Sequence, residues 1–202
     1  IIARPFVGSP GDFRRTANRR DFAMPPPGET ALDVLVRSGL SVTAVGKIED
    51  IFAGRGISRS RPSHANSESM SLLAGELAAG ERGLVLANLV DFDMLYGHRN
   101  DAAGYASALE TFDRELGGLL PGLGPGDMLV LTADHGCDPA HPGTDHTREF
   151  VPLLVYGPAL TVRDLGPRRS FADVGATVLE AFGLGPLGPG TSFMADILSA
   201  RA

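Results

Sequence analysis

The sequence predicts an α/β fold in which helices pack on a mostly parallel β-sheet. Strand-like apolar runs alternate regularly with helix-like segments along the chain, which is the pattern of α/β proteins. Residues 83–90, GLVLANLV, are apolar apart from Asn88, as is typical of a strand that is buried on both faces of a parallel sheet. Residues 102–120 repeat apolar side chains at helical spacing, which predicts a long amphipathic helix.

The first part of the chain begins with a short, arginine-rich segment, residues 1–22. The three prolines in residues 24–30, MPPPGET, predict a linker, because proline continues neither a helix nor a central strand. Thr30 is expected to cap a helix that ends at Gly39. Residues 41–47, SVTAVGK, are expected to form the next strand.

The same succession continues to the end of the chain. The expected elements are a helix at 67–80, the strand at 83–90, the helix at 102–120, strands at 127–133 and 150–157, and a helix at 170–183. Gly80 and Gly183 are expected to end two of these helices, and Ser170 is expected to cap the last one. The sequence contains no internal repeat and no low-complexity stretch.

The composition argues against several classes of protein. Hydrophobic residues make up 43% of the 202 positions and charged residues 21%, which suits a chain that can bury a core. The apolar runs are far shorter than the roughly 20 residues that span a bilayer, and no signal segment opens the chain. The net charge of -6 argues against general nucleic-acid binding. Since a single cysteine excludes an internal disulfide framework, we expect a cytoplasmic protein without a membrane partner.

Acidic and histidine side chains gather just after two of the predicted strands. They are Asp91, Asp93 and His98 after the strand at 83–90, and Asp134, His135, His141 and His146 after the strand at 127–133. Ligands of open α/β sheets bind beyond the carboxyl ends of the strands, so we expect these side chains to converge there. Carboxylates with imidazoles suit a pair of divalent cations, Mn²⁺ or Zn²⁺ before Mg²⁺, which act as Lewis acids on phosphoryl oxygens.

Some of these residues have a second interpretation. A lone aspartate after a strand is commonly a helix cap or a loop residue, whereas the adjacent pair Asp134 and His135, with His146 beyond, favours a metal site. Cys137 could reach a metal from its place in the same loop, but a small, half-buried side chain is its commoner role. His64 is expected to be a solvated loop histidine.

The start of the chain is basic in an otherwise acidic protein. Residues 1–20 contain one acid, Asp12, and five arginines, namely Arg4, Arg14, Arg15, Arg19 and Arg20. A solvated charged loop explains this pattern as well as a phosphate clamp does. Guanidinium groups offer bidentate donors to a phosphate dianion, so a clamp would suit a substrate with an anionic group away from the reacting centre.

Two longer motifs resemble a known family. VDFDMLYGHRND, residues 90–101, and TADHGCDPAHPGTDHTREFVPLLVYGP, residues 132–158, closely resemble the phosphopentomutase family of the alkaline phosphatase superfamily. IIARPFVG, RTANRRDF, VGKIEDIF and GTSF are similar to other stretches of that family, so the resemblance covers essentially the whole chain. The ADHG unit alone is shared with cofactor-independent phosphoglycerate mutases, whereas PGTDHTREFVP and DFDMLYGH are more specific.

The resemblance implies an alkaline-phosphatase-like three-layer sandwich that binds two Mn²⁺ ions and carries an inserted cap domain. Residues 1–22 would be the trailing end of the cap, and residues 23–202 the C-terminal part of the metal-binding core. The implied ligands are Asp93, His98 and His146 for one metal and Asp134 and His135 for the other, and the implied contacts to substrate phosphate are Arg4, Arg15 and Arg19.

The family also implies an activity. Its members interconvert ribose 1-phosphate and ribose 5-phosphate, and the deoxyribose analogues, through a phosphothreonine and with a sugar bisphosphate activator. The family's threonine nucleophile and a further metal-binding aspartate have no counterpart in this sequence, so no catalytic residue is assigned. Because the chain opens with IIARPFVG rather than with Met, we expect a missing upstream part. Because the nucleophile and one carboxylate are lacking, we expect no turnover by this chain alone. The rival functions are a phosphoglycerate mutase or phosphatase of the same superfamily and a non-catalytic metal-binding module.

Overall fold

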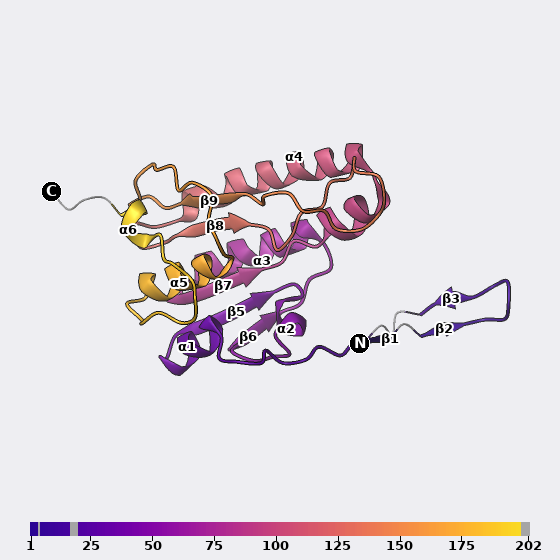
Figure 1. Ribbon diagram of the computed structural model, residues 1–202, viewed down its shortest axis with the longest axis horizontal. Helices are drawn as coiled ribbons and strands as arrows, with labels where there is room; N and C mark the ends of the chain where they lie inside the picture. Colours follow the sequence, from indigo (N-terminus) through magenta and orange to yellow (C-terminus); the bar gives the residue numbers. More distant parts are fainter. Residues whose placement is uncertain (4, 17–19, 199–202) are drawn as a thin grey trace.

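Strands and helices alternate through most of the chain (Figure 1). The computed structural model describes residues 1–3, 5–16 and 20–198. The strands are β1 (Ile2–Ala3), β2 (Phe6–Val7), β3 (Arg14–Arg15), β4 (Arg20–Asp21), β5 (Ser41–Val45), β6 (Arg59–Arg61), β7 (Gly83–Ala87), β8 (Leu129–Thr132) and β9 (Leu153–Tyr156). The helices are α1 (Ala31–Arg37), α2 (Ile48–Ile51), α3 (Asn66–Ala79), α4 (Ala102–Leu119), α5 (Ala172–Ala181) and α6 (Met194–Ile197), with the π-helix η1 (Phe92–Tyr96) and the 3₁₀-helices η2 (Gly97–Arg99) and η3 (Leu120–Gly122). The expected helices and strands therefore appear in the expected order, but the structure also contains elements that were not predicted, among them β6 and α2.

Three parallel strands form the central sheet in the order β6–β5–β7 (Figure 1). In the register of β5, Val42 lies beside Leu84 of β7, and Thr43 lies beside both Val85 of β7 and Arg59 of β6. Four of the five residues of β5 are fully buried, as in a parallel strand that is covered by helices on both faces. The predicted parallel arrangement is confirmed for this sheet.

The side chains of β5 alternate between two helical layers, because successive residues of a strand point to opposite faces. Val42 faces α1 and α5, with which it forms the apolar core, and the buried members of that core are Leu32, Leu35, Val42 and Leu179. Thr43 faces the other side, where it accepts a hydrogen bond from Arg59, whose guanidinium pairs with Glu76 of α3 at 2.5 Å. The three layers are therefore α1 with α5, the sheet, and α3 with α4 packed beside it.

The pair β8–β9 differs from the expected parallel arrangement. These two strands are antiparallel, with Leu131 beside Leu154. Residues 133–152, which connect them, contain no helix, and a parallel neighbour would need a crossover of a dozen or more residues that is usually helical. The connection instead continues the hairpin, with Gly136 and Thr147 bridged across it.

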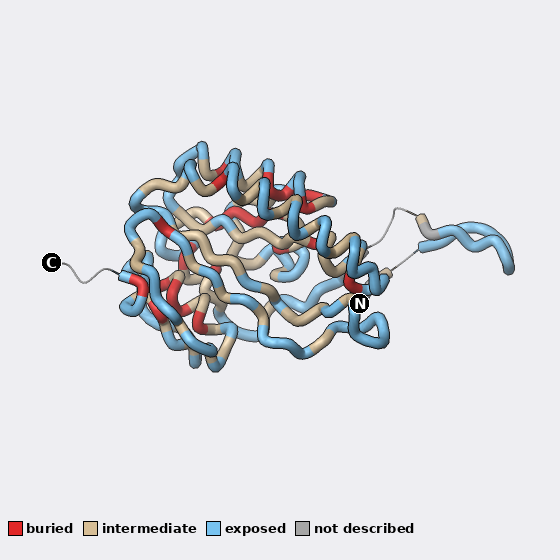
Figure 2. Tube along the Cα trace, turned by 90° about the horizontal axis from the view of Figure 1, so that it is seen from above, coloured by how far each residue is buried: buried red, intermediate tan, exposed pale blue. Residues whose placement is uncertain are grey.

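Two short antiparallel pairs form the N-terminal segment. β1 pairs with β4, and β2 pairs with β3, with Phe6 beside Arg15 in the register. The rings of Phe6 and Phe13 meet edge to face at 5.0 Å. Figures 1 and 2 show the β2–β3 hairpin away from the α/β body, with exposed residues along it. The predicted boundary between a cap segment at 1–22 and a core at 23–202 stays a prediction.

The first long helix begins and ends where the sequence predicts. The Thr30 side chain accepts a hydrogen bond from the Asp33 N–H, and the Asp33 carboxylate accepts one from the Thr30 N–H at 2.7 Å. This reciprocal capping box satisfies backbone donors that would be unpaired at the start of α1. Gly39 follows the helix with a φ of 77°, in the left-handed region that glycine adopts without strain.

The last long helix begins slightly later than predicted. Phe171 occupies the N-cap position of α5, and Ser170, the predicted cap, lies one residue before it. The Ser170 hydroxyl still accepts a hydrogen bond from the Ala172 N–H at 3.1 Å, so the side chain contributes to the start of the helix. Gly183 ends the helix as predicted, with a φ of 73°.

α4, with 18 residues, is amphipathic and packs against α3. Its exposed positions include the charged Glu110, Asp113 and Arg114, but Leu109, which was expected on the apolar stripe, is also exposed. Among the helices of the described residues, none has both the length and the apolar character that crossing a bilayer requires.

A buried carboxylate joins three segments near the end of the chain. Asp173 of α5 is 4% exposed and accepts hydrogen bonds from the Thr191 N–H and the Arg168 Nε, each at 2.9 Å. The Thr191 N–H lowers the pKa of Asp173, burial opposes this change, and Arg168 lowers the pKa further. A lowered pKa stabilises the fold above the unfolded value of roughly 3.9, and that contribution is lost as the pH falls through the folded value.

Asp173→Asn should lower the free energy of unfolding by about 1–3 kcal/mol at neutral pH, because the charged bond to Arg168 is lost in a buried place. The difference between the two chains should shrink as the pH falls below roughly 4 towards the lowered pKa of the folded chain, where the wild-type Asp173 carboxylate becomes protonated. Urea unfolding of the 202-residue chain, followed by circular dichroism, measures both effects. The exposed Asp113→Asn is the matched control, and equal stability of the two variants at neutral pH would contradict the role of Asp173.

Candidate metal centre

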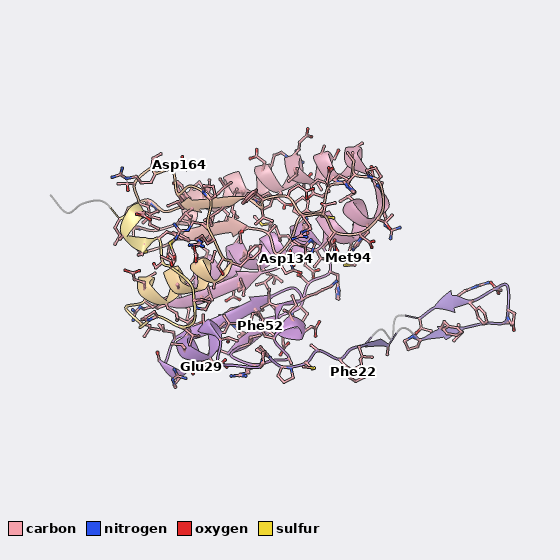
Figure 3. The ribbon with its side chains drawn as sticks, in the orientation of Figure 1. Phe22, Glu29, Phe52, Met94, Asp134 and Asp164 are labelled. Carbon is pink, nitrogen blue, oxygen red and sulfur yellow. The ribbon has the colours of Figure 1, made fainter. Side chains whose placement is uncertain are left out.

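The loops that leave β7 and β8 meet at one end of the molecule. η1 follows β7, and residues 133–152 follow β8. Figure 3 labels Met94 of η1 and Asp134 of the second loop at this end. The contact is direct, because the Cys137 Sγ in the second loop lies 3.6 Å from Oδ1 of Asp93 in η1. The expected convergence of the two motifs is therefore present.

Asp93 lies in η1, a single turn of π-helix. A π-turn is wider than an α-turn, and such turns are frequently found at functional sites. Phe92 anchors this turn on α4, with its ring centre 5.4 Å from that of Tyr105 and 6.2 Å from that of Phe112. η2 follows at once and brings His98 back towards Asp93.

Asp93 stands between two imidazoles. Its Oδ1 lies 3.3 Å from the His98 Nε2 and 3.2 Å from the His146 Nε2. The ring of His135 stacks on that of His146, with centres 3.6 Å apart. Metal-binding atoms of Asp93, His135 and His146 all lie within 4.8 Å of one another. One carboxylate and three imidazoles thus come together from two loops.

Backbone carbonyl groups orient two of these imidazoles. The Nδ1 of His98 donates to the Thr144 carbonyl at 2.5 Å, which leaves the Nε2 lone pair directed towards Asp93. The Nδ1 of His135 likewise lies 3.0 Å from the Gly136 carbonyl. A histidine that ligates a metal commonly donates its other N–H to a carbonyl or carboxylate, which holds the ring in place. His98 and His135 both meet that requirement.

Asp134 lies at the edge of this group. Its side chain is 70% exposed, and its Oδ1 is 3.6 Å from the His135 Nε2. The structure groups His135 with Asp93 and His146, across the expected division into two ligand sets. The assignment of Asp134 and His135 to one ion, and of Asp93, His98 and His146 to another, stays a prediction.

Three other candidates lie outside the group. Asp91 directs a carboxylate oxygen to the Asn66 N–H, at 2.8 Å, rather than into the cluster. His141 is exposed on a turn, where its carbonyl accepts a hydrogen bond from the Asn100 side chain at 2.9 Å. His64 is also exposed, as expected for a solvated loop histidine.

Cys137 lies against Asp93 as a neutral thiol. Burial raises the pKa of Cys137, and the negative charge of Asp93 raises it further. A thiol rather than a thiolate is a weak hydrogen-bond donor and a poor metal ligand. The sulfur also fills the space beside Gly97, where a β-carbon would overlap it. The geometry therefore favours a packing role for Cys137.

The structure describes only part of the expected phosphate clamp. Arg4 and Arg19 lie outside the described residues, and for Arg15 only the backbone, in β3, is described. Arg14 is exposed and forms an ion pair with Asp12 at 3.2 Å. The clamp therefore stays a prediction.

Two further residues at this edge were not anticipated from the sequence. Lys47, the only lysine of the chain, follows β5, and its Nζ lies 2.8 Å from the Met94 Sδ. Asn66 begins α3 and binds Asp91. The available signals were a cation just beyond a strand that ends at this edge and an asparagine at the start of a predicted helix.

The donor set fits a divalent cation. Carboxylate oxygen with imidazole nitrogen is the combination that Zn²⁺, Mn²⁺ and related ions accept. The Nε2 atoms of His98 and His146 both face the same oxygen of Asp93, and the donor atoms of Asp93, His135 and His146 are close enough to one another to hold one ion. The residues present are therefore suited to the divalent metal that the sequence predicts.

Comparison with known proteins agrees with this chemistry. A model of the Metalloenzyme superfamily matches residues 35–186. The phosphopentomutases of Anaeromyxobacter sp. (strain K) and Caldanaerobacter subterraneus subsp. tengcongensis are 57% and 54% identical to this chain over 98% of its length. Each match covers 50% of the relative, so the chain spans about half the length of these curated relatives. The predicted resemblance to phosphopentomutases is confirmed.

A solved structure supports the fold class. The phosphoglycerate mutase of Leishmania mexicana, crystallised at low cobalt concentration, matches with a TM-score of 0.64. The match covers 80% of this chain and 38% of the mutase at 22% sequence identity, so it concerns the fold alone. Together with the match to the Metalloenzyme superfamily, it confirms the predicted alkaline-phosphatase-like α/β sandwich.

His146→Ala should weaken Mn²⁺ binding by the 202-residue chain at least about tenfold, because it removes an imidazole that faces Asp93. Titration with Mn²⁺, with the free ion followed by electron paramagnetic resonance, measures the affinity. The exposed His64→Ala is the matched control and should bind like the wild type. Equal affinities for the two variants would rule out His146 as a ligand.

Gly97→Ala should lower the free energy of unfolding by about 1–3 kcal/mol, because its methyl group overlaps the Cys137 sulfur. Since that sulfur touches Asp93, Mn²⁺ affinity should fall as well. Adding Cys137→Ala removes the sulfur and should restore most of both losses. Urea unfolding and the same Mn²⁺ titration test this, and a double variant no better than Gly97→Ala would refute the overlap as the cause.

Proposed function

Because the chain belongs to the Metalloenzyme superfamily, we propose that it forms the metal-binding, C-terminal part of a phosphopentomutase. Such an enzyme interconverts ribose 1-phosphate and ribose 5-phosphate, and the deoxyribose analogues. The observation that carries the proposal is the high identity to phosphopentomutases across nearly the whole chain. The cluster of Asp93, His98, His135 and His146 supports it, because divalent cations stabilise the charge on a phosphoryl group during transfer.

The proposed cofactors are two divalent ions, Mn²⁺ in the first place, with Mg²⁺ or Zn²⁺ as alternatives. Asp93, His98 and His146 would hold one ion, and Asp134 and His135 would hold the other. Bound there, the ions would supply Lewis-acid stabilisation for charge on the phosphoryl group in transfer. The exposed Asp134 is available for such a role, since solvent rather than protein covers most of its side chain.

The chain's own residues would prepare the centre before substrate arrives. The Thr144 and Gly136 carbonyl groups hold the rings of His98 and His135, so these imidazoles need little reorganisation on binding an ion. Arg4, Arg15 and Arg19 would hold the phosphate that is not reacting. They would also help to exclude water, because hydrolysis would turn a mutase into a phosphatase.

The 202-residue chain alone is proposed to have no mutase activity. The family's threonine nucleophile and a further metal-binding aspartate have no counterpart in it, so turnover would depend on the half of the relatives that this chain does not span. The complete enzyme is proposed to use a sugar bisphosphate activator and to act in the cytoplasm.

A chimeric enzyme tests the proposal. This chain would replace the matching half of the Anaeromyxobacter phosphopentomutase, and the chimera would be assayed with ribose 5-phosphate and with 3-phosphoglycerate. We expect isomerisation of ribose 5-phosphate by the chimera and none by the 202-residue chain. His146→Ala in the chimera should lower the rate at least about a hundredfold, whereas His64→Ala should leave it unchanged.

Three outcomes would overturn the proposal. Turnover of 3-phosphoglycerate in place of ribose 5-phosphate would indicate a phosphoglycerate mutase. Isomerisation by the isolated chain would show that the nucleophile lies within it. An inactive chimera that is folded by circular dichroism and binds Mn²⁺ would favour a non-catalytic metal-binding module.

A further inference from the structure

Asn66 and Asp91 exchange two hydrogen bonds at the sheet edge that carries the metal centre. The Asn66 N–H donates to Oδ2 of Asp91 at 2.8 Å, and the Asp91 N–H donates to Oδ1 of Asn66 at 2.9 Å. Asn66 is 7% exposed, so water does not compete freely for these bonds. A buried, reciprocal pair of this kind fixes both partners, because loss of either leaves polar groups unpaired.

The pair first of all secures the start of α3. Asn66 is the first residue of this helix of 14 residues, and Ala65, at the N-cap position, has no side chain that could cap it. The Asp91 carboxylate takes that place by accepting the Asn66 N–H. Its negative charge also lies at the positive end of the helix dipole, where carboxylates are stabilising.

The same pair constrains the backbone that carries Asp93. Asp91 directly precedes η1, and its N–H is held by Asn66. The Met94 N–H is bound to the Val90 carbonyl at 3.0 Å, so the first turn is closed around Asp91. Asp93, which faces the imidazoles, lies inside this closed turn. A change in the position of Asp91 would therefore also change the position of Asp93.

The anchor on the other side is itself firmly placed. The hydroxyl groups of Ser63 and Ser69 are hydrogen-bonded at 2.7 Å, and both residues are buried. The Ser69 hydroxyl also lies 3.2 Å from the Ala65 carbonyl. These bonds tie the loop after β6 to the first turn of α3, so Asn66 is held from both sides. It can act as a fixed point for the β7 loop.

We infer that Asn66 is a positioning residue of the metal centre, which sets the place of Asp93 by clamping Asp91. The inference rests on the proposed function, because it assigns a positioning role to residues beside the metal site, and the proposed function requires that site. It also assigns Asp91 to the clamp rather than to a metal, since the carboxylate is directed to α3 and lies outside the cluster of metal-binding atoms.

Hydrogen exchange of the metal-free 202-residue chain tests whether the Asn66–Asp91 pair holds the backbone of η1 in place. Asn66→Ala should speed amide exchange across residues 91–97 about fivefold or more, as the loss of a cap does. Thr30→Ala is the matched control, because it removes the cap of α1 at a distance from the centre. It should speed exchange in α1 only. Unchanged exchange across residues 91–97 in Asn66→Ala would overturn the inference, whatever the metal affinity.

Mn²⁺ affinity then distinguishes positioning from a purely structural role. Asn66→Ala should weaken binding about tenfold, whereas Thr30→Ala and Asp91→Asn should stay within about twofold of the wild type. Asp91→Asn keeps an oxygen for the Asn66 N–H, so it preserves the clamp without the charge. Equal affinity of Asn66→Ala and Thr30→Ala would overturn the inference. So would a loss in Asp91→Asn as large as in Asp91→Ala, because Asp91 would then act as a ligand.

The two proposals can fail separately. If the wild-type chain binds no Mn²⁺ but Asn66→Ala still loosens residues 91–97, the clamp is supported and the proposed metal chemistry fails. If Mn²⁺ binds and the chimera is active while Asn66→Ala changes neither exchange nor affinity, the proposed function is supported and the clamp fails.

Discussion

The carboxylate of Asp93 is the point on which this end of the molecule depends. His98 reaches it from the turn after η1, and His146 and Cys137 reach it from the long loop after β8. A partly buried negative charge needs hydrogen-bond donors or a cation close to it. The Asp93 carboxylate is therefore a common point of contact for the two loops and a common ligand site beside the histidines. Asp93 therefore takes part both in the contact between the loops and in the candidate metal site.

The rest of the fold keeps that point in place. β5 is buried on both faces and gives the sheet a rigid centre. The loop at 133–152 is braced by the bridge between Gly136 and Thr147, and the Asp138 N–H donates to the Thr147 hydroxyl at 2.8 Å. Reactive side chains thus lie on loops that a scaffold positions, as in many enzymes. The β2–β3 hairpin lies apart from this scaffold (Figures 1 and 2).

Much of the fold could be predicted because its signals are local. Thr30 caps α1, and glycines follow α1 and α3 where a left-handed residue is needed, as at Gly39 and Gly80. Apolar runs located β5 and β7 of the central sheet, whereas the polar β6 was not predicted. The direction of β9 could not be predicted, because a buried strand has the same apolar pattern whether it pairs parallel or antiparallel. Its direction was decided by a connection without a crossover helix.

For the site, the sequence by itself determined which ligands are available, since carboxylates and imidazoles follow strands whose ends meet at one edge. Only the tertiary structure decided how they are used. It stacks His135 on His146, and it turns Asp91 away to Asn66, which is 25 positions distant in the chain. It also leaves the side chain of Asp134 exposed. Such choices depend on contacts between segments far apart in sequence, and no local pattern of residues encodes the geometry in which those segments meet.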